Sequence, residues 1–314
     1  MLQRRNVKET GWNPAPSSSV LLAIFACLLW STAFVGVKIG LRYADPFSFA
    51  GIRFMLAGLM LVPFWWRKRA GLALLADNFR SILLVSFFQT FLVYGLFYLG
   101  MTMVPGSLAA ILIGASPLTA ALVAHYLMHN EAITPAKLVS LGIGMAGVVL
   151  ISINSKPWVS PAGLKEFLGI VLLFLCTVSS GLGNVLVARE KSAINPVELN
   201  SLQIFLGGFF LLAVSVVQYG MPELHLPLVY YLALLWLAIL SAVAFTLWFI
   251  LLQRPGISVS SLNLWKFIIP VCGALLSWLL LPEEEPHLLS VLGMLCTAVA
   301  IVLYSLADKK ATVT

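Results

Sequence analysis

Long runs of apolar residues, separated by short polar segments, make up most of this chain of 314 residues. A helix needs about 20 mostly apolar residues to cross the hydrocarbon core of a bilayer. Runs of roughly that length, bounded by charge, proline or glycine, predict an all-α membrane protein with ten transmembrane helices. They cover residues 20–39, 46–66, 80–100, 105–127, 136–153, 168–188, 197–218, 228–252, 257–281 and 288–306.

The segments between these runs are short, and the longest two, 67–79 and 154–167, have about a dozen residues each. They leave no room for a soluble catalytic or nucleotide-binding domain. The phosphate-binding pattern G-x-x-x-x-G-K-[ST] is also absent from the sequence. We therefore expect a protein that is neither an enzyme nor an ATP-driven pump and that uses no cofactor.

The composition agrees with a lipid-exposed surface. Hydrophobic residues make up 61% of the chain and charged residues 10%, whereas soluble domains have about 25% charged residues. The four cysteines, Cys27, Cys176, Cys272 and Cys296, all lie inside apolar runs. They fit neither a disulfide framework nor a zinc site, so we expect no metal.

The net charge of +7 does not indicate a nucleic-acid partner, because the Lys and Arg residues lie in short clusters between the runs. With a cytoplasmic N-terminus, 13 of the 19 lie inside, four lie outside (Lys38, Arg42, Lys156 and Lys165) and two lie within runs (Arg53 and Lys266). The positive-inside rule therefore predicts cytoplasmic tails at 1–19 and 307–314.

The chain repeats itself. Asp45-Pro46 recurs as Asn195-Pro196, and Pro105-Gly106 recurs as Pro255-Gly256, in both cases 150 residues later. These repeats predict two halves of five helices each, residues 20–153 and 168–306, joined by a periplasmic linker at 154–167. An odd number of spans per half places the second half upside down, as in the inverted repeats of secondary transporters.

Further motifs are shared by the two halves. The second run has the form Pro…Arg-Phe, from Pro46 to Arg53-Phe54. The fourth and ninth runs have the form Pro-(apolar)-Glu, in Pro117-Leu118 through Glu131 and Pro270-Val271 through Glu284. In their order and repetition these features resemble the EamA family of the drug/metabolite transporter superfamily. The resemblance implies a bundle of inverted repeats (5+5) around a central cavity. It also implies transport of small metabolites, amino acids or drugs across the bacterial inner membrane, often outward.

Lys266 is the main candidate for solute binding, because it lies about mid-way along the ninth run. A charge at that depth costs at least ~2.5–3.5 kcal/mol on insertion scales. At 100° per residue, Asn263, Lys266, Pro270, Gly273 and Ser277 share one polar and small helix face. Pro270 also leaves the Lys266 carbonyl without its helical partner. We interpret this as a broken-helix binding site. A lysine that snorkels, or that pairs with a carboxylate of another helix, is the alternative.

Two other cations are weaker candidates. Arg53 lies about two turns into the second run, where it either contacts the solute or bonds loop carbonyls near the outer interface. Lys38 ends the first run, where a lysine can snorkel and complement a helix C-terminus.

Neutral polar and aromatic residues form further stripes at helical spacing. On the sixth run the stripe is Thr177, Ser180 and Asn184, and on the seventh it is Asn200, Gln203 and Gly207. Such stripes either line a cavity or join helices. Ser180 and Asn184 are further candidates for solute binding.

Aromatic residues form a face on the third run, Phe87, Phe91, Tyr94 and Tyr98, opposite Gln89. This face either packs or walls a cavity. Trp30 is mid-way along the first run, away from the interfacial belt that tryptophans favour, so we consider it a candidate cavity wall.

Three other patterns have simpler explanations. The G-x-G-x-x-G pattern at 142–147 lies within a predicted membrane helix, which favours helix packing over dinucleotide binding. His125 and His129, with Glu131 nearby, are expected at the cytoplasmic interface rather than on a metal. The acidic triplet 283–285 precedes Pro286 and the tenth run, where carboxylates complement the helix N-terminus.

No Asp or Glu lies near the middle of any run, and Glu198, at the start of the seventh, comes nearest. Small multidrug resistance proteins, which are related, use a mid-membrane glutamate for proton-coupled export of cationic drugs, so that mechanism is disfavoured. The buried cation instead favours an anionic or zwitterionic solute, such as an amino acid or a carboxylated metabolite.

We therefore predict a multi-pass secondary transporter of the bacterial inner membrane, monomeric or homodimeric, that exposes a midplane site to each side in turn. Its partners are a small-molecule solute and the lipid bilayer. The alternatives are a lipid or isoprenoid-carrier flippase, a drug exporter of the same superfamily, a non-transporting sensor, and a membrane enzyme acting on lipids. The last needs clustered acidic or histidine residues, and the acidic triplet 283–285 has no evident partner.

Overall fold

The computed structural model describes residues 16–66, 71–114, 116–128, 134–154, 161–190, 194–223, 225–280 and 288–311. These residues form helices and connecting turns, with no strand among them. The first half contains α1 (Pro16–Ser31), α2 (Ala33–Gly40), α3 (Pro46–Trp65), α4 (Gly71–Val85), the π-helix η2 (Ser86–Phe91), α5 (Leu92–Met101), α6 (Gly106–Gly114), α7 (Ser116–Leu127) and α8 (Pro135–Asn154). The second half contains α9 (Pro161–Arg189), α10 (Pro196–Tyr219), α11 (Leu228–Gln253), α12 (Val259–Leu264), the 3-10 helix η3 (Trp265–Phe267), α13 (Ile268–Leu280) and α14 (Leu288–Ala311).

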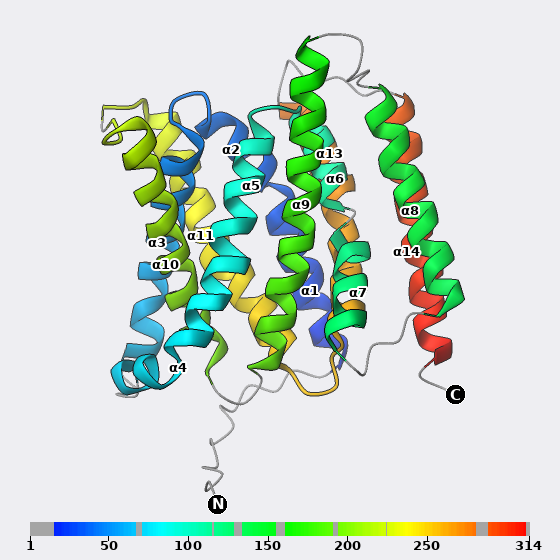
Figure 1. Ribbon diagram of the computed structural model, residues 1–314, viewed down its shortest axis with the longest axis horizontal. Coiled ribbons are helices and arrows are strands. Elements are labelled where there is room, and N and C mark those ends of the chain that lie inside the picture. The colour runs from blue at the N-terminus through cyan, green and yellow to red at the C-terminus, as the bar shows by residue number, and fades with distance from the viewer. Residues whose placement is uncertain are drawn as a thin grey trace, which may run out of the picture.

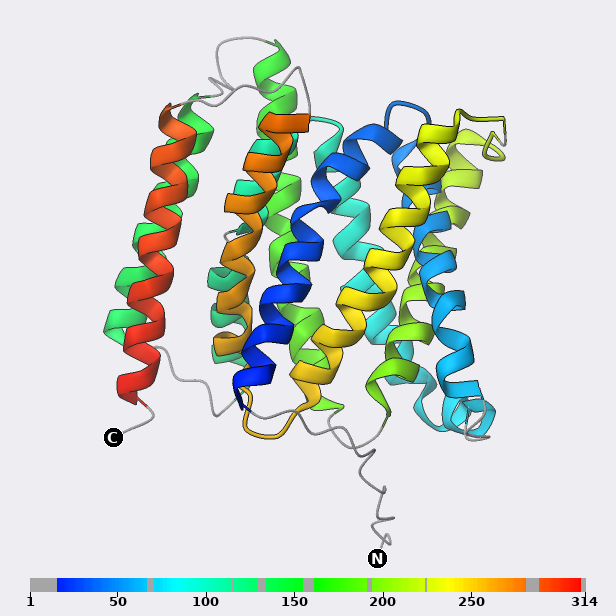
Figure 2. The same cartoon turned by 180° about the vertical axis from the view of Figure 1, so that it is seen from behind.

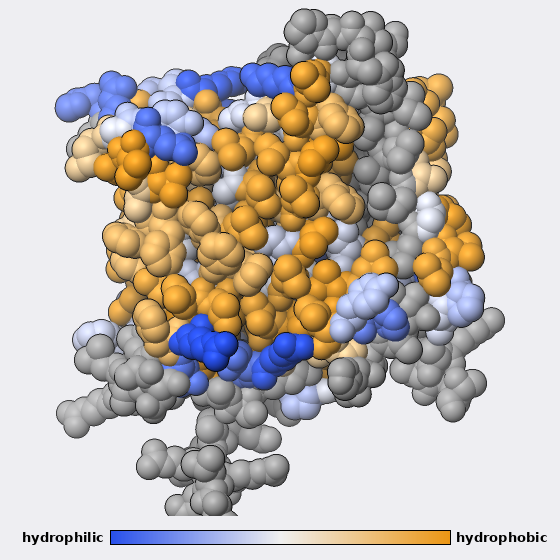
Figure 3. Space-filling view, viewed as in Figure 1, coloured by the Kyte–Doolittle hydropathy of each residue, from blue (hydrophilic) through white to orange (hydrophobic). Residues whose placement is uncertain are grey.

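Six helical stretches are long and apolar enough to cross a membrane: Ser18–Gly40, Pro46–Trp65, Asn78–Met101, Gly163–Arg189, Pro196–Tyr219 and Leu228–Gln253. The helices stand side by side, and α1 begins at the same end of the bundle at which α14 ends (Figures 1 and 2). On the face shown in Figure 3, an apolar band lies between hydrophilic residues at the two ends. The all-helical membrane class predicted from the sequence is confirmed.

Two predicted connections are partly helical. Helix α9 begins at Pro161, within the predicted linker 154–167, and α4 begins at Gly71, within the predicted loop 67–79. In both places the helix begins before the predicted run, because a helix does not have to end where the chain leaves the hydrocarbon core. Hydropathy therefore located the buried part of each helix but not its end.

The starts of α3 and α10 follow from local chemistry. Asp45 accepts hydrogen bonds from the backbone N–H groups of Phe47 (3.0 Å) and Ser48 (2.9 Å), and Pro46 occupies the first helical position. Asn195 accepts a hydrogen bond from Val197 (3.0 Å), and Pro196 follows it. An Asx residue satisfies free N–H groups while proline presets the backbone angle.

Helices α3 and α10 pack closely where both carry glycine. A Cβ atom on Gly58 would lie 2.8 Å from the Ser201 carbonyl oxygen, and one on Gly208 would lie 2.8 Å from the Gly51 carbonyl oxygen. These distances are too short for any side chain, so glycine sets the separation of the two helices. Figure 2 shows that α3 and α10 run in opposite directions.

Helices α8 and α14 pack against each other on the side of the bundle opposite to α3 and α10 (Figure 1). The G-x-G-x-x-G pattern at 142–147 falls inside α8. Gly144 packs against Leu118 and Ala300, as the packing interpretation expects, whereas a Cβ atom on Gly142 would meet nothing within 4 Å.

Candidate functional site

A cavity of about 90 Å³ lies inside the bundle. A single water needs about 10–15 Å³, so the cavity holds several. Helices of both halves line it, and the polar side chains in its wall are Arg53, Gln89, Tyr94, Ser116, Thr177, Ser180 and Lys266.

The cavity lies beside interruptions in the helices. Trp30 precedes Thr32, the turn residue between α1 and α2; Gln89 lies in the π-helix η2; and Lys266 lies in the 3-10 helix η3. All three side chains line the cavity. The break at Lys266 agrees with the expectation from Pro270, which cannot donate a hydrogen bond to the Lys266 carbonyl. Irregular helix geometry is frequent at functional sites.

The ammonium group of Lys266 lies between two indole rings. Its side chain is 7% exposed, and Nζ lies 5.7 Å from the ring centroid of Trp30 and 4.9 Å from that of Trp248. Within the described ranges no carboxylate lies at salt-bridge distance from Nζ. The two rings therefore stabilise the charge by cation–π interaction where a counter-ion would otherwise be expected.

Arg53 is held by hydrogen bonds. Its Nε donates to the Leu237 carbonyl (3.2 Å) and to Ser241 Oγ (2.9 Å), and its Nη1 donates to the hydroxyl of Tyr98 (2.8 Å). The side chain is 1% exposed and also lines the cavity. Arg53 thus joins α3 to α11 and α5, through helix groups rather than the loop carbonyls expected from the sequence.

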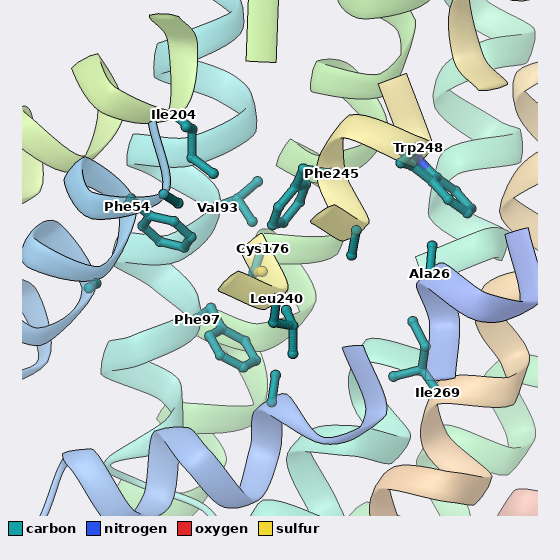
Figure 4. Packing of buried hydrophobic residues seen from close by; sticks show 14 of the residues in the cluster. Ala26, Phe54, Val93, Phe97, Cys176, Ile204, Leu240, Phe245, Trp248 and Ile269 are labelled. Atoms are coloured by element: carbon teal, nitrogen blue, oxygen red, sulfur yellow. The ribbon is translucent and has the colours of Figure 1, made fainter. Parts of the chain in front are cut away.

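Aromatic rings form much of the remaining wall. The Tyr94 ring centroid lies 4.3 Å from that of Phe54 and 5.9 Å from that of Phe245, and Trp30 lies 5.2 Å from Phe245. Figure 4 shows Val93, Phe97, Cys176 and Phe245 gathered in the same region, and these four also line the cavity.

Asn184 and Asn263 lie behind the cavity wall rather than in it. Asn184 Nδ2 donates to Asn263 Oδ1 (3.0 Å), Asn263 Nδ2 donates to the Val259 carbonyl (2.8 Å), and Gln89 Nε2 donates to Asn184 Oδ1 (3.4 Å). Both asparagines are fully buried. This chain of amides connects η2 of the first half to α9 and α12 of the second.

The polar stripe on α10 joins helices. Asn200 Nδ2 donates to Thr246 Oγ1 (3.0 Å), Gln203 Nε2 donates to Asn200 Oδ1 (3.0 Å), and Thr90 Oγ1 donates to Gln203 Oε1 (2.6 Å). Gly207 packs against Thr90. These bonds connect α10 with η2 and α11, the second of the two uses expected for such a stripe.

Lys38 has a capping role. Its Nζ donates to the carbonyls of Met101 (2.8 Å) and Val104 (2.5 Å), at the C-terminus of α5. A cation there complements the helix dipole. The helix is α5 and not the lysine's own, which sequence alone does not reveal.

Other candidates lie away from the cavity or outside the described residues. His125 lies in the last turn of α7 with its ring 5.3 Å from that of Tyr126. His129, Glu131 and the acidic triplet 283–285 lie outside the described residues. Among the described residues, no three His, Cys, Asp or Glu side chains are grouped as metal ligands.

The sequence did not indicate several residues of this region: Phe34, Phe97, Ser116, Cys176, Phe245 and Trp248. Cys176 and Phe97 each lie one residue before a member of the stripes noted on α9 and α5, and so fall outside the spacing that defines those stripes. Phe245 and Trp248 lie on α11, which is apolar on every side, so no periodic stripe marks its face toward the cavity. A tryptophan or serine in such a helix carries no positional signal.

These features define a multi-pass α-helical membrane protein with an internal cavity that contains two buried cations. The profile of the EamA-like transporter family matches residues 17–153 and 167–306, and the chain therefore belongs to this family of membrane transporters. Both matches together cover nearly the whole chain, so the resemblance noted from the sequence is confirmed.

Curated relatives are also transporters. The chain is 27% identical to "Uncharacterized transporter YvbV" of Bacillus subtilis, over 94% of each protein. It is 26% identical to the "S-adenosylmethionine/S-adenosylhomocysteine transporter" of Chlamydia trachomatis, over 90% of this chain and 88% of the relative. A solved crystal structure has the same fold, with a TM-score of 0.71 and 18% identity over 95% of this chain and 99% of the other.

Proposed function

We propose that this protein is a secondary transporter of the bacterial inner membrane that moves a small solute bearing an anionic group. Amino acids and other zwitterionic or anionic metabolites belong to this class. The observation that carries the proposal is Lys266, a buried cation that lines the cavity and contacts two indole rings.

The energetic argument concerns the cost of burying a charge. An uncompensated ion in the low-dielectric interior is strongly unfavourable, and cation–π contacts recover only about 2 kcal/mol. An anionic solute at Lys266 supplies the missing counter-charge and receives a partner in return. Ionisable residues kept at membrane depth commonly mark solute pathways for this reason.

We further propose that the ten helical spans form two inverted halves. Gly58 contacts Ser201, and Gly208 contacts Gly51. Gly208 lies 150 residues after Gly58, and Ser201 lies 150 residues after Gly51, so the two contacts are equivalent in the two halves. Such reciprocal contacts are expected across a two-fold axis, where residue i meets j and j meets i. Because α3 and α10 run in opposite directions (Figure 2), the axis lies in the membrane plane.

The larger packing pattern supports the same arrangement. We number the spans 1 to 10 from α1 to α14. Three contacts between the halves then have a counterpart between the spans five positions on. Helix α1 packs on α11 as α9 packs on α5, α1 packs on α13 as α9 packs on α7, and α3 packs on α11 as α10 packs on η2. Rocking of two such halves around a fixed site is the alternating-access mechanism of inverted-repeat transporters.

One curated relative is named for solutes that have two chemically distinct parts. S-adenosylmethionine and S-adenosylhomocysteine, named for the chlamydial relative, both carry a carboxylate and an aromatic base. The cavity is lined by Lys266 and by the aromatic rings of Tyr94 and Phe245, and these offer groups suited to each.

Purified protein in proteoliposomes tests the proposal. Solutes are first selected by thermal shift from amino acids, organic acids and nucleosides, because a ligand that binds only the folded state raises its stability. We expect Lys266→Met to reduce uptake of the selected solute at least tenfold and Lys266→Arg to retain part of it. Lys165→Met is the matched control, because that lysine is exposed at the start of α9. Normal uptake by folded Lys266→Met protein contradicts the proposal.

A further inference from the structure

The charges around the cavity are all of one sign. Lys266 and Arg53 line it, whereas 11 of the 12 Asp and Glu residues of the sequence lie outside the apolar runs. The remaining one, Glu198, lies in the first turn of α10. No carboxylate of this chain is therefore placed to receive a cationic group at mid-membrane depth.

Four polar groups that line the cavity can each donate a hydrogen bond to a ligand. Arg53 uses Nε and Nη1 within the protein, and Nη2 makes no hydrogen bond to the described residues. The same holds for the Lys266 ammonium and for the hydroxyls of Tyr94 and Ser180. Two of these four groups are donors only, and the two hydroxyls can donate or accept.

The remaining strong acceptor in the wall faces the protein. A Cβ atom on Gly183 would collide with Oε1 of Gln89, so this amide occupies the space that the glycine leaves on α9. Oε1 is buried and has no hydrogen-bond donor near it. In this arrangement it offers nothing to a solute, and Nε2 is directed to Asn184.

We infer that the cavity selects solutes of net negative charge, and that it prefers a 2-oxo or 2-hydroxy acid to the corresponding α-amino acid. The inference rests on the proposed transport function and narrows its solute class. The carboxylate pairs with Lys266, and the oxo or hydroxyl oxygen accepts from Arg53 Nη2 or the Tyr94 hydroxyl. An α-ammonium group in the same place meets two cations and no carboxylate, and so is buried without a counter-ion.

Ligand series with one carbon skeleton test this selection on the native protein. For the leucine skeleton the series is 4-methylpentanoate, 4-methyl-2-oxopentanoate, L-leucine and 3-methylbutylamine, and the phenylalanine and glutamate skeletons give equivalent series. Affinity is measured by thermal shift and by competition for uptake. We expect the oxo acid to bind at least tenfold more tightly than the amino acid, and the amine not to bind. S-adenosylhomocysteine should bind more tightly than S-adenosylmethionine, whose sulfonium adds a positive charge.

The outcomes separate this inference from the transport proposal. Tighter binding of the amino acids, lost in Lys266→Met, overturns the charge selection and leaves a transporter that uses Lys266. Binding that is the same in native protein and Lys266→Met overturns both.

A negative charge added to the cavity wall provides a second test. Ser180→Asp supplies the missing carboxylate, and Ser180→Asn is the control of equal size without the charge. We expect Ser180→Asp to shift the preference at least tenfold toward L-leucine, and Ser180→Asn to keep the preference for the oxo acid. An unchanged preference in folded Ser180→Asp protein, or an equal shift in both variants, contradicts the inference.

Discussion

At the scale of single residues, the two cations of the cavity have different surroundings. Arg53 makes three hydrogen bonds to α11 and α5, while Lys266 lies near two indole rings and makes no hydrogen bond to the described residues. The guanidinium group provides several donors in fixed directions and can bind protein and ligand together. Arg53 Nε and Nη1 are thus already bonded within the protein, whereas all the hydrogen bonds of the Lys266 ammonium are available to the proposed solute.

Two neighbouring tyrosines, Tyr94 and Tyr98, differ in their hydrogen bonds and give a prediction at this scale. Tyr98 is fully buried and accepts a hydrogen bond from Arg53, whereas the Tyr94 hydroxyl has no partner in the described chain and its side chain lines the cavity. We predict that Tyr98→Phe lowers the free energy of unfolding by about 1.5–3 kcal/mol, the usual value for a hydrogen bond to a charged group. Tyr94→Phe should change stability little but weaken solute binding. Thermal unfolding in detergent and uptake assays measure the two effects, and equal stability losses in both variants contradict this assignment.

The sequence identified the charged residues of the site better than the apolar ones. A lysine or arginine in an apolar run is conspicuous at any position, so Lys266 and Arg53 could be found without a structure. Trp248 and Phe245 could not, because α11 is apolar on all sides and its period gives no direction. Asn184 and Asn263 were expected on the cavity, yet they bond each other behind it, and only the tertiary packing determines which use a buried amide has.

At the scale of helices, the sequence likewise indicates some interruptions of the helices and not others. Hydropathy locates the apolar ranges, and Pro270 indicates the irregular turn at Lys266. The π-helix at 86–91 and the turn at Thr32 have no proline or glycine to indicate them, because they depend on how neighbouring helices pack. For example, Ser179 on α9, in the second half of the chain, donates a hydrogen bond from Oγ to the Phe88 carbonyl within η2 (2.9 Å).

Close packing of α3 and α10 gives a prediction at this scale. An added methyl group on Gly208 would lie within 2.8 Å of the Gly51 oxygen and the Met55 nitrogen, both of the backbone. Because neither can move independently of its helix, Gly208→Ala should lower the free energy of unfolding by about 1–3 kcal/mol, as overpacking does. Gly58→Ala should cost a similar amount, since it meets the reciprocal contact.

The control is Gly142→Ala on α8, where an added Cβ meets nothing within 4 Å. There alanine should stabilise the protein by up to about 1 kcal/mol through its helix propensity. Thermal or denaturant unfolding of the three variants gives the comparison. A tolerated Gly208→Ala would show that the helices can separate without cost.

At the scale of the whole molecule, the proposed inversion makes a prediction about sidedness. Pro105 and Pro255 are equivalent positions of the two halves, 150 residues apart, and both are exposed. Pro105 lies in the connection between α5 and α6, and Pro255 in the connection between α11 and α12, at opposite ends of the bundle (Figure 1). A parallel repeat would place equivalent loops on one side of the membrane, whereas an inverted repeat must place them on opposite sides.

Single cysteines in a cysteine-free background decide between these arrangements and fix the orientation. We predict that a membrane-impermeant maleimide added to intact cells labels Pro105→Cys and not Pro255→Cys, and that permeabilised cells label both. The direction follows from the positive-inside rule, because Arg254 adjoins Pro255 while the 102–105 connection has no Lys or Arg. Labelling of Pro255→Cys alone in intact cells reverses the orientation but keeps the inversion. Labelling of both in intact cells removes the inversion itself, and with it the argument that two halves rock around the site at Lys266.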